Sequence, residues 1–86
     1  MARVYILRGS TGRHYIGSTL ELARRLHEHR SGGTHTTRRL GTKLELVIAR
    51  RLPSLAEARQ LERDLKRKKN PGLAIHLLEQ FPDTEQ

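Results

Sequence analysis

The chain has 86 residues, enough for one small domain with a modest core. It contains no cysteine, which excludes disulfides, thiolate metal sites and cysteine nucleophiles, and it has no apolar run of the roughly 20 residues needed to cross a membrane. Its 17 basic residues, 13 of them arginine, outnumber 9 acidic ones and give a net charge of +8. Because arginine pairs two oxygens of one phosphate, we expect nucleic acid as the partner.

We expect one domain over residues 1–80 and a frayed tail over residues 81–86. The amino terminus lacks the long apolar stretch of a signal peptide, so we expect a soluble, cytoplasmic protein with no membrane partner. The chain has only three aromatic residues, which argues against base stacking as the main mode of nucleic-acid binding.

The first part of the chain is predicted to form a β-hairpin with strands over residues 3–8 and 13–18. A two-residue loop between them would pair Tyr5 with Ile16 and place Tyr15 on the opposite face of the sheet. A three-residue loop with a left-handed glycine would place both tyrosines on one face. We expect the three-residue loop.

A helix is expected to follow the hairpin. Ser18 and Glu21 form a capping-box pattern that would begin the helix at about Thr19, and a pair of glycines would end it. Arg25 and His29 are four residues apart on this helix and therefore share a face, next to its leucine row.

The rest of the chain is predicted to contain one strand and one long helix. The polar, glycine-bounded segment 33–42 is typical of a loop or short helix that contacts substrate. A third strand is predicted over residues 44–51, and a capping box at Ser54 begins a helix that runs to Asn70. Residues 73–78 predict either a short final helix or an extended segment.

The order and spacing of a few residues carry the most information. Tyr5 lies between two apolar residues, and nine residues separate it from Tyr15, which begins Tyr-Ile-Gly. The pattern Leu-x-x-Arg25-Leu-x-x-His29 follows. With an acidic residue on a late helix, this pattern resembles the GIY-YIG endonuclease family over nearly the whole chain. Within the family it looks like small single-domain bacterial proteins similar to the N-terminal catalytic module of excinuclease C.

The resemblance implies an α+β fold with a three-stranded antiparallel sheet flanked by helices. It also implies phosphodiester hydrolysis in DNA, assisted by a single Mg²⁺ or Mn²⁺ ion. In such enzymes the residue that matches Tyr5 is the general base, and the one that matches Tyr15 supports it or positions the phosphate. The residue that matches Arg25 stabilises the pentacoordinate phosphate, the one that matches His29 assists proton transfer or orientation, and Glu62 matches the metal ligand.

The match has two departures. The first motif reads Val4-Tyr5-Ile6 rather than Gly-Ile-Tyr, which keeps the tyrosine but loses the glycine, and Ser18 stands where some members have a lysine that contacts phosphate. The predicted substrate contacts are Gly17, Ser18, His35, Thr37, Arg38, Arg39, Lys66 and Asn70, although the equivalence of Asn70 to the family's asparagine is open.

The chemistry agrees with these residue types. Phosphodiester hydrolysis needs a fixed cation where charge develops and a group that takes a proton from water. A tyrosine with a pKa of about 10 is a weak base at neutral pH, so we expect Arg25 and the metal to lower its pKa. Because Mg²⁺ retains waters, a site with one protein carboxylate is expected to bind it weakly without DNA.

Each residue also has an ordinary structural interpretation. A single tyrosine is often a half-buried strand residue, and Arg25 or His29 alone is often a surface or packing residue. Glu62 is placed to form a helical ion pair with Lys66, although it lies at the margin of an apolar stripe where a carboxylate is costly. The basic run 63–69 is either a solvated helix face or a phosphate-contacting ridge.

The primary hypothesis is a bacterial, nucleoid-associated DNA endonuclease that cuts one strand at a time, with branched or damaged DNA as substrate and a role in DNA repair. The alternative is a nucleic-acid-binding module that keeps the fold without hydrolysis. A third hypothesis is a basic protein that binds structured RNA. The oligomeric state stays open.

Overall fold

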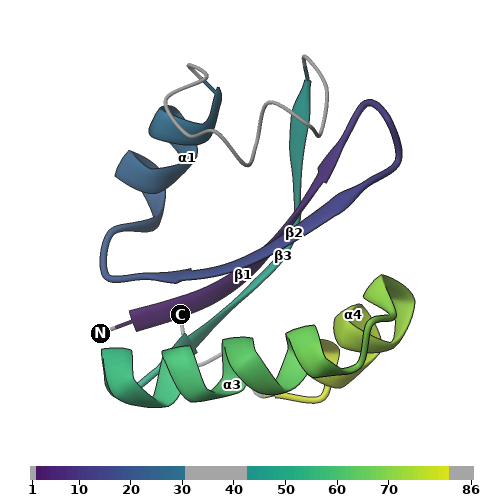
Figure 1. Ribbon diagram of the computed structural model, residues 1–86. Coiled ribbons are helices and arrows are strands. Elements are labelled where there is room, and N and C mark those ends of the chain that lie inside the picture. Colours follow the sequence, from purple (N-terminus) through teal and green to yellow (C-terminus); the bar gives the residue numbers. More distant parts are fainter. Residues whose placement is uncertain (1, 31–42, 82–86) are drawn as a thin grey trace.

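The protein is described by a computed structural model that covers residues 2–30 and 43–81 (Figure 1). Its elements are β1 (Ala2–Gly9), β2 (His14–Thr19), α1 (Leu22–Arg30), β3 (Leu44–Leu52), α3 (Leu55–Arg67) and α4 (Pro71–Glu79). The three strands form one antiparallel sheet in the order β2-β1-β3, which confirms the predicted α+β fold. The predicted substrate loop, 33–42, lies outside the described residues. Among the described helices, none combines the length and apolar character that a membrane span requires.

The two faces of the sheet bury different side chains. On one face of β1, Ala2, Val4 and Ile6 are fully buried and pack with apolar residues of α3 and α4, which forms the main hydrophobic core. Strand alternation places Tyr5 and Leu7 on the other face. Figure 1 shows α1 on that side of the sheet, opposite α3 and α4. Side chains of β1 on one face therefore pack against α3 and α4, and those on the other face point toward α1.

The hairpin has the register that the three-residue loop predicts. Tyr5 pairs with Gly17, and Leu7 pairs with Tyr15. Gly12, the last residue of the loop, has φ of 87°, a conformation that glycine adopts without a Cβ clash. Both tyrosines therefore lie on the same face of the sheet, as predicted.

The predicted start of the first helix is wrong. α1 begins at Leu22 rather than at about Thr19, because β2 continues through Thr19 as a paired strand. The Thr19 hydroxyl oxygen accepts a hydrogen bond of 3.1 Å from the backbone N–H of Glu21. Ser18 does not cap the helix, since its hydroxyl donates to Glu62 at 2.5 Å.

Ser54 is the N-cap of the second predicted helix, as expected. The Ser54 hydroxyl oxygen accepts a hydrogen bond of 3.2 Å from the backbone N–H of Glu57 at the start of α3. The helix ends at Arg67, before the predicted end at Asn70. Asn70 instead caps α4, where its Oδ1 accepts a hydrogen bond of 3.1 Å from the backbone N–H of Leu73. The final apolar segment is therefore a separate helix.

Candidate active site at the edge of the sheet

Three aromatic rings meet on the face of the sheet that α1 covers. They belong to Tyr5 in β1, Tyr15 in β2 and His29 in α1. The ring centroids are 6.2 Å apart for the two tyrosines, 5.9 Å for Tyr5 and His29, and 4.9 Å for Tyr15 and His29. Tyr5 is fully buried and Tyr15 is half-buried, so the cluster opens to solvent beside Tyr15.

Gly17 leaves the space that the two tyrosine rings occupy. A Cβ atom at this position would lie 2.6 Å from Tyr5 Oη and 2.9 Å from Tyr15 Cε1. Real Cβ atoms essentially never come this close to another heavy atom, so any side chain here would displace the rings. The glycine of the Tyr-Ile-Gly motif therefore sets the position of both phenols, and its contact with substrate stays a prediction.

Tyr5 and His29 form a buried hydrogen bond, with Tyr5 Oη 2.9 Å from His29 Nε2. Burial, and next the positive charge of Arg25, lower the pKa of His29 below its usual 6.5. Burial also raises the pKa of Tyr5 to about 12, although the interaction with Arg25 acts in the opposite direction. The expected acidification of Tyr5 by Arg25 is thus present but outweighed by burial.

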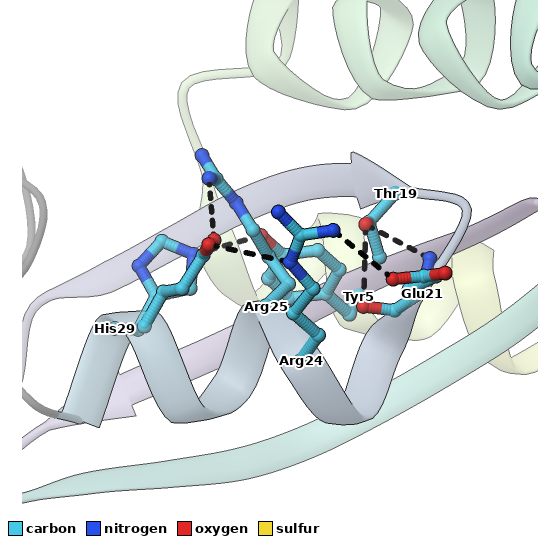
Figure 2. A network of polar contacts seen from close by, with 7 residues as sticks. Tyr5, Thr19, Glu21, Arg24, Arg25 and His29 are labelled. Carbon is cyan, nitrogen blue, oxygen red and sulfur yellow. Dashed lines mark hydrogen bonds and ion pairs between the residues drawn. The ribbon is translucent and has the colours of Figure 1, made fainter.

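Arg25 places its guanidinium between acidic and phenolic partners. Figure 2 shows it on α1 beside Tyr5 and His29. Its interaction with the Tyr5 hydroxyl is the largest cause that raises its pKa, and Glu28 and Tyr15 add to this effect. The Nη1 atom lies 3.1 Å from Glu28 Oε1. Glu28 was not among the predicted site residues, although its three-residue helical spacing from Arg25 could have indicated this contact.

Glu62 lies on α3, on the opposite face of the sheet, and contacts the edge strand β2 at Ser18. Its Oε1 accepts the 2.5 Å hydrogen bond from Ser18, and its Oε2 lies 2.6 Å from Lys66 Nζ. Lys66 Nζ in turn lies 5.9 Å from the centroid of the Tyr15 ring. Burial is the main cause of the raised pKa of Tyr5, and the negative charge of Glu62 contributes. The Glu62 side chain is only 19% exposed, and its ion-pair partner Lys66 links it to the Tyr15 ring.

The donor atoms around Glu62 fit a hard divalent cation with few protein ligands. Among residues 2–30 and 43–81, no three His, Cys, Asp or Glu side chains form a metal-binding group. Mg²⁺ typically keeps several waters and binds one or two carboxylates together with substrate phosphates. The Glu62 carboxylate and the adjacent Ser18 hydroxyl supply oxygen donors of this kind. Lys66 competes for one of the carboxylate oxygens.

One further predicted contact, Asn70, lies within the described residues. Asn70 caps α4 and lines a pocket together with Tyr15 and Lys66. Four predicted substrate contacts lie outside the described residues, namely His35, Thr37, Arg38 and Arg39.

Comparison with known proteins identifies the family of this chain. The family model of the GIY-YIG catalytic domain matches residues 1–74. A UPF0213 protein of Streptococcus pneumoniae serotype 4 is 39% identical over 70 residues, covering 81% of this chain and 71% of the relative. One from Streptococcus pneumoniae strain R6 is 37% identical over 70 residues, with the same coverage of 81% and 71%. The solution NMR structure of UPF0213 protein BH0048 from Bacillus halodurans is similar, with a TM-score of 0.54, 30% identity, and coverage of 99% of this chain and 95% of that chain. The chain therefore belongs to the GIY-YIG family.

Proposed function

We propose that this protein is a divalent-metal-dependent endonuclease that hydrolyses phosphodiester bonds in DNA, one strand at a time. The observation that carries the proposal is the convergence of Tyr5, Tyr15, His29 and Arg25 in one cluster under α1, which opens to solvent beside Tyr15 on the edge strand β2. Glu62 adds a carboxylate from across that edge. These groups supply the acid–base, cationic and metal-binding functions that phosphodiester hydrolysis requires.

Tyr5 and His29 form a proton relay in this mechanism. With a pKa of about 12, Tyr5 is a neutral phenol near pH 7. It can take a proton from the attacking water only if it passes its own proton to another group. His29 Nε2 lies 2.9 Å from the hydroxyl, and the lowered pKa of His29 keeps its imidazole neutral and able to accept that proton.

Arg25 stabilises the pentacoordinate phosphate. Its raised pKa keeps the guanidinium charged, and its partial exposure, 37% of the side chain, leaves it accessible to an incoming phosphate. A fixed cation in a partly desolvated site stabilises developing negative charge without reorganising. Tyr15, at the open side of the cluster, positions the same phosphate.

Glu62 and Ser18 would hold the Mg²⁺ or Mn²⁺ ion. When bound, such an ion supplies positive charge that stabilises phosphate oxygens as they become more negative. Lys66 must first release the Glu62 carboxylate, to which it is bonded at 2.6 Å. Lys66 Nζ is then free to pair with a phosphate of the substrate strand.

DNA with branches or damage is the proposed substrate, and the proposed setting is DNA repair in the bacterial nucleoid. The net charge of +8 supports a polyanionic partner but does not distinguish DNA from RNA. The second candidate function is a nucleic-acid-binding module without hydrolysis. The raised pKa of Tyr5 and the engaged carboxylate of Glu62 favour this candidate, because both oppose catalysis in the ligand-free site.

Cleavage assays on nicked, branched and single-stranded DNA with Mg²⁺ or Mn²⁺ test the proposal. We expect metal-dependent cleavage that Arg25→Ala reduces by about 10²–10³-fold. The matched control is Arg24→Ala, which removes the same charge from a side chain that is 74% exposed and pairs with Glu21 and Glu28. Undiminished cleavage by Arg25→Ala would reject the assigned role. Salt-sensitive binding without any cleavage would favour the non-catalytic module.

A further inference from the structure

A pocket of about 400 Å³ adjoins the candidate active site. It lies between β2 and the end of α3, where the chain turns into α4. Tyr15 and Lys66 line this pocket, and both also contact the groups of the active site. A substrate strand that reaches Tyr15 therefore passes the mouth of the pocket.

The lining of the pocket combines apolar walls with cations. Ile16, Leu65 and Pro71 form apolar surface beside the Tyr15 ring. Lys66 and Lys69 contribute positive charge, and both are exposed. No acidic residue of the described chain lines the pocket.

Lys69 has an unusual backbone conformation. Its φ of 51° is left-handed, and among the described residues it is the one non-glycine residue with positive φ. The position follows the end of α3, where glycine is commonly found because it lacks the Cβ clash. A lysine here costs roughly 1 kcal/mol of backbone strain relative to glycine. Such strain is frequently associated with ligand-binding sites, and here it lies at the pocket.

We propose that this pocket binds one nucleotide of the substrate strand adjacent to the scissile phosphate. The base contacts Tyr15 and the apolar walls, and the phosphate pairs with Lys69, while Lys66 joins it once its ion pair with Glu62 opens. The size of the pocket lies within the roughly 300–1,000 Å³ of small-molecule sites. Apolar walls beside cations fit a nucleotide better than an inorganic anion, which has no apolar part. The path of the strand rests on the proposed function.

Nitrogen-edited NMR spectra of the protein in EDTA test this proposal without any hydrolysis. The probe is a 5′-phosphorylated thymidine dinucleotide, and inorganic phosphate and a free mononucleotide are titrated separately. We expect the dinucleotide to shift amide signals of residues 14–16 and 65–70 most strongly. Inorganic phosphate should produce smaller shifts at higher concentration, and the mononucleotide should bind more weakly than the dinucleotide.

Two lysine variants separate the pocket from general electrostatics. Lys69→Gly removes the side chain and relieves the left-handed strain, so it should unfold at the same or a higher temperature while binding the dinucleotide about five- to tenfold more weakly. Lys68→Gln removes the same charge one residue away, from a residue outside the pocket lining, and should bind within about twofold of the parent.

Each result decides between the pocket and another explanation. Equal losses in the two variants, or shifts spread over the whole basic surface, would show non-specific charge attraction and overturn the pocket. If inorganic phosphate bound as tightly as the dinucleotide, the pocket would be an anion site and the nucleotide proposal would be overturned. If the mononucleotide bound at least as tightly as the dinucleotide, the proposal that the pocket binds a nucleotide within a longer strand would be overturned. Because the titration contains no metal, a protein that binds in the pocket but cleaves nothing would refute only the nuclease. If the protein cleaves DNA but the amide signals of the pocket residues do not shift with the dinucleotide, only the proposed nucleotide site would be refuted.

Discussion

The hydroxyl oxygen of Tyr5 lies 2.9 Å from Nε2 of His29, although 24 residues separate them along the chain. The bond joins the central strand β1 to helix α1, and both residues are buried. A contact that helps hold α1 against the sheet is therefore also the contact through which we expect a proton to move. Changes to either residue should affect stability and catalysis together, and the size of each effect distinguishes the two roles.

Tyr5→Phe should abolish most cleavage while preserving the fold. The ring remains, so packing is kept, but the relay loses the hydroxyl that we propose takes the proton from water, and a loss of about 10²–10⁴-fold in kcat is expected. His29 also loses a buried hydrogen-bond partner, which should lower the free energy of unfolding by about 1–3 kcal/mol. Single-turnover cleavage and urea unfolding measure the two effects. A folded variant with full cleavage would contradict the relay.

His29 should make stability fall in acid. Its pKa in the folded protein is below its usual 6.5, so the unfolded chain binds more protons in this range. Its stabilising effect is therefore complete above pH 6.5 and is lost as the pH falls through the folded pKa. Urea unfolding between about pH 5 and pH 8 should show this decrease, and His29→Gln should flatten it. His76→Gln, on the exposed surface of α4, should leave the decrease unchanged.

The hairpin could be predicted because its determinants are local. Loop length fixes which residues pair, and a glycine at the end of the turn permits the φ of 87° that the three-residue loop adopts. Once this register is known, both tyrosines must share a face. Arg25 and His29 follow from helical spacing alone. These local rules account for most of the cluster.

The role of Ser18 could not be predicted, because its partner is 44 residues away. In the sequence, Ser18 and Glu21 have the spacing of a capping box, but pairing with β1 keeps the chain extended to Thr19. The pKa of Tyr5 was also beyond the sequence, since burial by α1 and the sheet decides its direction. Tertiary contacts override local pattern at both places.

Gly17→Ala should disrupt the site through sterics. The new Cβ would lie 2.6 Å from Tyr5 Oη, so the ring must move and its bond to His29 must lengthen or break. We expect a loss of roughly 1–3 kcal/mol in the free energy of unfolding and a large loss of cleavage. Gly72→Ala is the control, because its Cβ would meet only Asn70 Oδ1 at 3.4 Å and alanine favours the helix. Equal behaviour of the two variants would contradict the spacing role of Gly17.

Lys66→Met should separate metal binding from DNA binding. Lys66 Nζ lies 2.6 Å from Glu62 Oε2, so its removal frees an oxygen that the metal requires, and half-maximal cleavage should need several-fold less Mn²⁺. The same change leaves the negative charge of Glu62 without its counter-charge beside the proposed path of the strand, so DNA affinity without metal should fall about five- to tenfold. Glu62→Gln should instead abolish metal-dependent cleavage and leave DNA affinity nearly unchanged. Calorimetric titration with Mn²⁺ and salt-dependent DNA binding measure both quantities. If Lys66→Met requires more metal than the parent, then Lys66 does not compete for the Glu62 carboxylate.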